Sequence, residues 1–117
     1  MARVSFLLIV TYMLPWLGVR EIEIREFLDA SGRSLFARYF DGLNAVAAAR
    51  VAIALARLGR GNFSNVKGVG TGVYELKIDF GPGYRVYFGK DGERIVVLLG
   101  GSAKKRQSAA IAAAQAA

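Results

Sequence analysis

The 117-residue sequence contains no cysteine and no histidine. Without cysteine, the chain has no disulfide, no thiol nucleophile and no zinc–thiolate site. Without histidine, it lacks the imidazole base of a Ser-His-Asp triad and the commonest side-chain ligand of transition metals. Any catalysis by this chain must therefore use lysine, arginine, tyrosine, carboxylate or backbone groups.

Acidic residues are also scarce, since 9 Asp and Glu stand against 16 Lys and Arg, which gives a net charge of +7. A basic excess on a small domain is typical of proteins with a polyanionic partner, usually nucleic acid, sometimes a ribosome or an acidic protein. Solubility alone is an equally good explanation of the charge. Hydrophobic residues make up 54% of the chain, which argues against disorder, and the length suits a single domain.

The first 19 residues are apolar and carry one charge, Arg3. The run is short for a transmembrane helix, which needs about 20 apolar residues, and it lacks the cleavage site of a secretion signal. We interpret residues 1–18 as an extension outside the domain, which then spans residues 19–117. A targeting or anchoring segment is the alternative. We expect a cytoplasmic protein without a membrane partner.

Periodicity and capping residues predict an α+β fold in the order β-α-α-β-β-β-α. The helices are expected on one sheet face, with the other face partly open. A loop is expected over residues 63–71, and the alanine-rich C-terminal helix should be either docked or frayed. The expected elements before the last three strands are a strand over 19–27 and helices over Ser34–Gly42 and Ala45–Leu58, the second capped by Asn44.

Three consecutive strands are predicted from residue 73 onward. Apolar residues alternate with polar ones as far as Phe80, and the turn Gly81-Pro82-Gly83 follows. A second strand leads to Asp91-Gly92, a strong two-residue hairpin signal. These turns predict that Ile78 lies opposite Val86, Lys77 opposite Tyr87 and Asp79 opposite Arg85, and that Ile95, Val97 and Leu99 share the packed face.

Cations gather on the expected open face. The predicted register brings Lys77, Arg85 and Tyr87 together, and the run Lys104-Lys105-Arg106 leaves the last strand at the same end. Arginine and lysine bind phosphate, and tyrosine stacks on unpaired bases. Cations at the start of a helix oppose its dipole, which favours a bound anion there. A solvated strand face, with Arg85 paired to Asp79, is the alternative, and it is the better explanation for Lys77 taken alone.

The acidic residues near this face do not form a metal site. Glu75, Asp79 and Glu93 are the candidates, and no pair of them has the spacing of metal ligands. We therefore expect metal-independent chemistry without a cofactor.

Two stretches carry a resemblance to a known family: Asn65-Val66-Lys67-Gly68-Val69-Gly70 and Gly81-Pro82-Gly83-Tyr84-Arg85-Val86-Tyr87-Phe88. From Val19 to its end the chain resembles the HigB-like addiction-module killer proteins of the RelE/ParE toxin superfamily. The resemblance implies a small β-sheet toxin that a cognate antitoxin, expected to be a helix-turn-helix protein, neutralises. RelE-like members cleave mRNA at the ribosome without metal, and the ribose 2′-hydroxyl attacks the adjacent phosphate.

The resemblance also implies roles for individual residues. Arg85 matches the arginine that stabilises transition-state charge, which is how preorganised cations act on a phosphorane. The other implied catalytic residues are Lys77 and the basic position after the last strand, Lys104 or Lys105; the implied RNA-binding residues are Lys67, Tyr84, Tyr87 and Arg106.

The sequence departs from the family pattern at two places. Glu75 stands where RelE has a second strand lysine, and residues 107–117 contain no counterpart of its late tyrosine. The general base is therefore unidentified, with Lys77, Tyr87 or the ribosome as candidates. Two other functions stay open: a ParE-like toxin that poisons DNA gyrase, and a degenerate toxin that only binds antitoxin or RNA.

Overall fold

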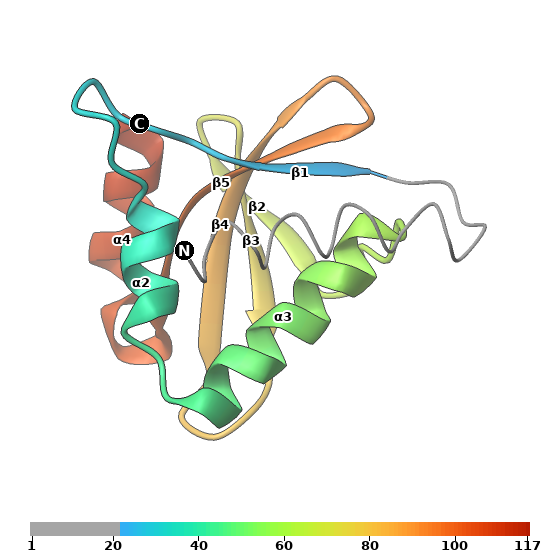
Figure 1. Ribbon diagram of the computed structural model, residues 1–117. Helices are drawn as coiled ribbons and strands as arrows, with labels where there is room; N and C mark the ends of the chain where they lie inside the picture. The colour runs from blue at the N-terminus through green and yellow to red at the C-terminus, as the bar shows by residue number, and fades with distance from the viewer. Residues whose placement is uncertain (1–21) are drawn as a thin grey trace.

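The computed structural model describes residues 22–117, so the expected extension over residues 1–18 lies outside the described part. The α+β class is confirmed: a five-stranded mixed sheet is combined with three α-helices (Figure 1). The elements are β1 (Glu23–Glu26), α2 (Leu35–Asp41), α3 (Ala45–Gly59), β2 (Val66–Gly70), β3 (Val73–Ile78), β4 (Tyr84–Asp91), β5 (Ile95–Ala103), a 3₁₀ turn (Lys104–Arg106) and α4 (Gln107–Ala116).

The strands lie in the order β1-β5-β4-β3-β2. β1 pairs with β5 in parallel, and the other neighbours are antiparallel. The predicted loop over residues 63–71 is wrong in part, because Val66–Gly70 forms the edge strand β2. Its glycines suggested a loop, but Val66 packs against the main core and Val69 against a small core on the opposite face of the sheet, and β3 supplies the hydrogen bonds.

The helical hairpin forms where the sequence predicts, and Asn44 caps α3 as expected. The side chains of Ser34 and Asn44 accept hydrogen bonds from the N–H groups of Ala37 and Ala47, at 3.0 and 2.9 Å. Such caps satisfy backbone donors that have no partner within the helix. One side of α3 is buried, through Ala47, Val51, Leu55 and Leu58.

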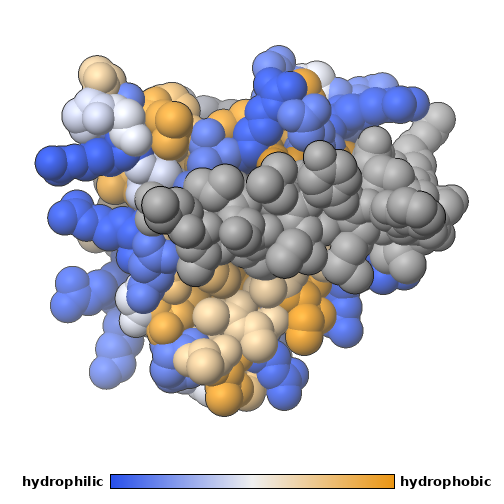
Figure 2. Space-filling view, viewed as in Figure 1, coloured by the Kyte–Doolittle hydropathy of each residue, from blue (hydrophilic) through white to orange (hydrophobic). Residues whose placement is uncertain are grey.

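Helices α2 and α3 cover one face of the sheet and enclose the main core. The core is built from aliphatic and aromatic side chains of the hairpin and of the strands: Phe36, Val51, Leu55, Leu58, Leu76, Ile78, Val86, Phe88, Val96 and Leu98. The outer side of α3 is mixed, since Val46 and Ile53 are 59% and 49% exposed. Figure 2 accordingly shows apolar and hydrophilic surface side by side on this side of the molecule.

The register between β3 and β4 differs from the prediction by two residues. Ile78 pairs with Tyr84, Lys77 with Arg85 and Glu75 with Tyr87. The turn is longer than predicted and includes Asp79 and Phe80, whose ring lies under the Arg50 guanidinium at 4.5 Å. A shift of two residues leaves each side chain on its predicted face, because the period of a strand is two.

The predicted register between β4 and β5 is wrong, and it put the wrong set of β5 side chains on the core face. A three-residue connection replaces the two-residue turn, so Asp91 pairs with Ile95, and Val96 and Leu98 enter the core. A bulge opposite Tyr87 and Phe88 then shifts the pairing again. Beyond the bulge, Ser102 pairs with Arg85 and shares its face.

The second face of the sheet is less open than predicted, because α4 docks on it. Val73, Tyr87 and Ala114 form a second small core, and Gln115 Nε2 donates to the carbonyl oxygen of Val69 at 3.0 Å. Of the two states expected for the alanine-rich helix, the docked one is therefore found. Within residues 22–117 no helix is long and apolar enough to cross a membrane.

Gly101 is required by a close approach of an aromatic ring. A β-carbon added to Gly101 would lie 2.3 Å from the Tyr39 ring. We expect Gly101→Ala to lower the free energy of unfolding by about 1–3 kcal/mol, as overpacking does. Urea denaturation measures the change. Gly68→Ala is the control, because a β-carbon at Gly68 meets no atom within 4 Å; equal stability of the two variants would contradict the account.

Candidate functional site

Two rows of side chains cross the sheet on the face that α4 partly covers. Pairing of neighbouring strands places Lys67 beside Glu75 and Glu75 beside Tyr87. The adjacent row contains Lys77, Arg85 and Ser102. The structure therefore brings the predicted residues Lys67, Lys77, Arg85 and Tyr87 to one face, as the strand period requires.

A buried ion pair lies at the centre of these rows. Arg85 Nε is 3.4 Å from Glu75 Oε1, and the two side chains are 7% and 2% exposed. Gln107 Nε2, at the start of α4, donates to the other carboxylate oxygen at 2.6 Å. Lys67 Nζ approaches Oε1 at 3.8 Å from the exposed side. The carboxylate thus lies among two cations and one amide.

The prediction that Arg85 is exposed is wrong. The alternative prediction, that Arg85 pairs with Asp79, is also wrong, because its partner is Glu75. Arg85 is 6% exposed, because Glu75 projects from the neighbouring strand and draws the guanidinium inward. Arg85 Nε is buried and has no hydrogen-bond partner among the described residues. The two charged groups are close, but the Arg85 Nε–H does not point at the carboxylate oxygen. The contact is therefore an ion pair without a hydrogen bond from Nε.

The other end of the guanidinium points toward the start of the 3₁₀ turn. Arg85 Nη1 donates to the Tyr84 carbonyl oxygen at 3.2 Å. A β-carbon built on Gly83 would lie 3.5 Å from both Arg85 Nη1 and Lys104 Cβ. Arg85 Nη1 and Lys104 Cβ therefore lie on the same side of Gly83.

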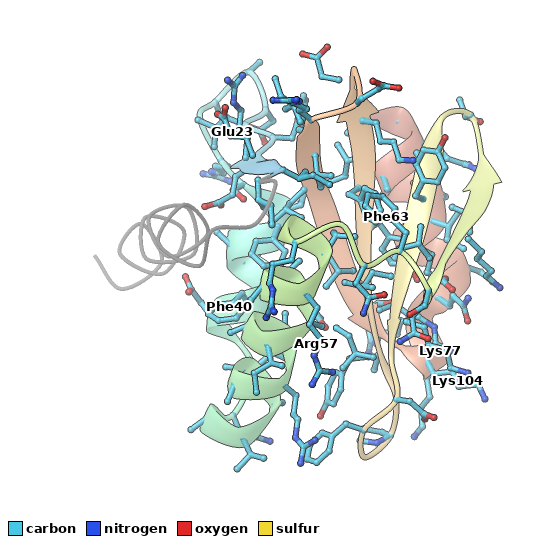
Figure 3. The ribbon with its side chains drawn as sticks, turned by 90° about the vertical axis from the view of Figure 1, so that its right-hand side faces the viewer. Glu23, Phe40, Arg57, Phe63, Lys77 and Lys104 are labelled. Carbon is cyan, nitrogen blue, oxygen red and sulfur yellow. The ribbon has the colours of Figure 1, made fainter. Side chains whose placement is uncertain are left out.

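Exposed cations surround this corner. Lys77, Lys104, Lys105 and Arg106 are all exposed, and Figure 3 shows Lys77 and Lys104 at the same end of the molecule. The Lys104 N–H donates to the Gly83 carbonyl oxygen at 3.1 Å, which ties the 3₁₀ turn to β4. We call Lys77, Arg85 and Lys104, with Glu75, the cationic corner.

The two tyrosines predicted to stack on bases differ in access. Tyr84 is half-buried and stacks on Phe80, with ring centroids 6.5 Å apart. Tyr87 is fully buried under α4, so the predicted exposure of its ring is wrong. Burial raises the pKa of the Tyr87 phenol above its ordinary value, and the Ser102 hydroxyl at 3.3 Å opposes the rise. A phenol with a raised pKa stays protonated, so Tyr87 is unsuited to act as a general base.

Two tyrosines with buried hydroxyl groups, the partly buried Tyr39 and the fully buried Tyr87, give a test of these assignments. Burial, with Tyr84 and Tyr87 nearby, raises the pKa of Tyr39, and Tyr39 Oη has no hydrogen-bond partner among the described residues. We expect Tyr39→Phe to stabilise the protein by about 1 kcal/mol, because it removes an unpaired buried hydroxyl. Tyr87→Phe should destabilise it by about 1 kcal/mol, because it breaks the contact with Ser102. Thermal denaturation compares the two, and shifts of the same sign would contradict the assignment.

The sequence did not identify Glu75 and Gln107 as parts of the site. Glu75 was considered only as an acidic candidate near this face and as a departure from the family pattern, yet it is one of the most buried polar residues described. Strand alternation, which puts Glu75 on the face of Lys77 and Arg85, was the available signal. Residues 22–117 contain no group of three or more carboxylates able to hold a metal ion.

Comparison with known proteins identifies a relative but no function. No protein-family model matches the chain. An uncharacterized protein of Haemophilus influenzae is 42% identical over 64 residues, which is 55% of this chain and 65% of the relative. The chain thus spans just under two thirds of the relative's length.

Proposed function

We propose that the protein is the toxin of a toxin–antitoxin module and that the cationic corner binds and cleaves mRNA. The observation that supports this best is the arrangement of Lys77, Arg85 and Lys104 at one end of the sheet, next to Gly83. A dianionic phosphorane is stabilised by preorganised cations of this kind. The α+β fold and the resemblance to the HigB-like toxins of the RelE/ParE superfamily support the same proposal.

The residues of the cationic corner have different roles in this proposal. Arg85 stabilises the charge that develops on the phosphate, and Lys77 and Lys104 bind the flanking backbone, together with Lys105, Arg106 and Lys67. Glu75 positions Arg85 through the 3.4 Å contact and, at 2% exposure, does not reach a ribose hydroxyl. Of the two side chains considered for the general base, the exposed Lys77 is retained and the buried Tyr87 is not.

Contact of Arg85 with a phosphate requires a local movement. Arg85 is 6% exposed, and Gln107 of α4 is bonded to its partner Glu75. The 3₁₀ turn and the first residues of α4 must therefore shift when RNA binds, and Lys104 moves with them. We propose that this occurs in the cytoplasm at the ribosome, and that a cognate antitoxin prevents it.

Induction in growing cells tests the function. We expect growth arrest and new 5′ ends within coding regions, detected by primer extension on an abundant message. Lys77→Ala/Lys104→Ala should abolish both, because it removes two cations that bind the RNA backbone. The variant should still fold, because these exposed side chains contribute little to stability. Intact transcripts with blocked replication would overturn the proposal and indicate a gyrase poison. RNA binding without cleavage would indicate a degenerate toxin.

A further inference from the structure

Half of β5 has an outer edge without a partner strand. β1 pairs only with Ile95–Leu98, so among the described residues no strand pairs with the outer side of Leu99–Ala103. The Lys104 N–H donates to Gly83 O, which makes Tyr84 and Ala103 a non-hydrogen-bonded pair. The N–H and C=O groups of Ala103, and of Gly101 two residues earlier, therefore point away from β4.

A groove of about 470 Å³ runs along this edge, and we call it the β5 groove. Its floor is Leu99–Ala103, one wall is formed by Leu35 and Tyr39 of α2, and the other by alanines of α4. Among residues 22–117, the charged side chains that line it are those of Arg38 and Arg106, and no carboxylate does. Both arginines are exposed, so the rim of the groove is cationic.

We propose that the β5 groove binds an extended acidic segment of a partner protein, which adds a strand to the outer edge of β5. Unpaired backbone groups of an edge strand bind peptides in this manner, and pockets for alternate side chains give specificity. Arg38 and Arg106 supply charge-assisted hydrogen bonds to carboxylates of the peptide. The β5 groove shares Arg106 with the proposed RNA-binding residues but contains no residue of the cationic corner, so the inference goes beyond RNA cleavage.

An extended peptide fits better than the other possible occupants. Five residues of strand edge span about 17 Å, which suits a segment of similar length. A helix would leave the backbone groups of Gly101 and Ala103 unpaired, since all its own are used internally. RNA would gain from the two arginines but not from the apolar walls formed by Leu35 and the α4 alanines.

The test begins with selection from a random peptide library on the full chain. We expect the selected peptides to carry Asp or Glu beside small or β-branched residues. The best of them, synthesised, should slow hydrogen exchange of the Gly101 and Ala103 amides. Arg38→Glu/Arg106→Glu should weaken its binding at least about tenfold. The control Arg57→Glu/Arg60→Glu, on exposed residues at the end of α3, should leave binding unchanged.

A backbone variant separates strand addition from simple charge attraction. Ala103 has φ −76°, which proline adopts, so Ala103→Pro removes one edge-facing N–H with little strain. We expect about tenfold weaker peptide binding at unchanged thermal stability. If the variant unfolds, amide exchange of the wild-type complex decides. The proposal is overturned if the library yields no binding peptide, or if the selected peptides lack acidic residues. It is also overturned if the Gly101 and Ala103 amides stay unprotected in the complex, or if a folded Ala103→Pro variant binds the peptide as well as the wild type. Protection of these amides by poly(U) RNA instead would assign the groove to nucleic acid.

Discussion

Arg85→Ala will lower the free energy of unfolding by about 3–5 kcal/mol, because it leaves the Glu75 carboxylate buried without its cation. Glu75 is 2% exposed, and its remaining neighbours are Gln107 and the exposed Lys67. Urea denaturation of the wild type and the variant measures the loss. The control is Lys77→Ala, an exposed neighbour on the same strand face, which should change stability by less than about 0.5 kcal/mol.

The double variant Arg85→Ala/Glu75→Gln should recover most of this loss. Glutamine carries no charge that burial would penalise, and its amide still reaches the Gln107 side chain. The double-mutant cycle isolates the interaction of the two residues. A loss in Arg85→Ala that Glu75→Gln does not relieve would show that the burial of Glu75 is not its cause. A loss of toxicity in Arg85→Ala alone would therefore not distinguish a loss of stability from a loss of catalysis.

RNA binding should depend strongly on salt, and the cationic corner should carry a defined part of that dependence. For single-stranded nucleic acid, each neutralised phosphate contributes about −0.7 to the slope of log K against log salt concentration. Lys77→Ala/Lys104→Ala should therefore reduce the magnitude of the slope by about 1.4. Fluorescence anisotropy with labelled poly(U) at several salt concentrations measures it.

A matched variant guards against a mere effect of net charge. Arg57→Ala/Arg60→Ala also removes two positive charges, but from the end of α3, on the opposite side of the sheet from α4. Its slope should stay at the wild-type value. If both double variants reduce the slope equally, RNA binds through general surface charge and the cationic corner is not its site.

The helical hairpin could be predicted because its signals are local. Ser34 and Asn44 cap the two helices, and the apolar spacing of α3 selects its buried side. β2 was missed, since its glycines are typical of loops and its pairing comes from β3, a separate element. The registers failed for a related reason: the turn at Gly81–Gly83 extends back over Asp79 and Phe80, and a three-residue connection replaces the two-residue turn expected at Asp91-Gly92.

The sequence predicted which residues of the candidate site share one face, but not which of them are buried. Strand alternation placed Lys77, Arg85 and Tyr87 on one face, and the structure agrees. The burial of Arg85 and Tyr87 depends on α4, whose docking rests on Ala114, Ile111 and the Gln115 contact with Val69. An alanine-rich helix has no strong periodic pattern, so the face that it covers could not be deduced. The Glu75–Arg85 pair could not be deduced either, since the predicted register placed Arg85 opposite Asp79.

The most direct test of the proposed function is cleavage of mRNA by purified protein, with and without ribosomes, comparing the wild type with Arg85→Ala/Glu75→Gln. The double variant is expected to fold, because it removes both charges of the buried pair and leaves neither unpaired. We predict that the wild type cleaves and that the double variant is slower by a factor of about 100 or more, the size of effect seen when one transition-state donor is lost. Equal cleavage by the two folded proteins would contradict the assignment of Arg85 to the scissile phosphate.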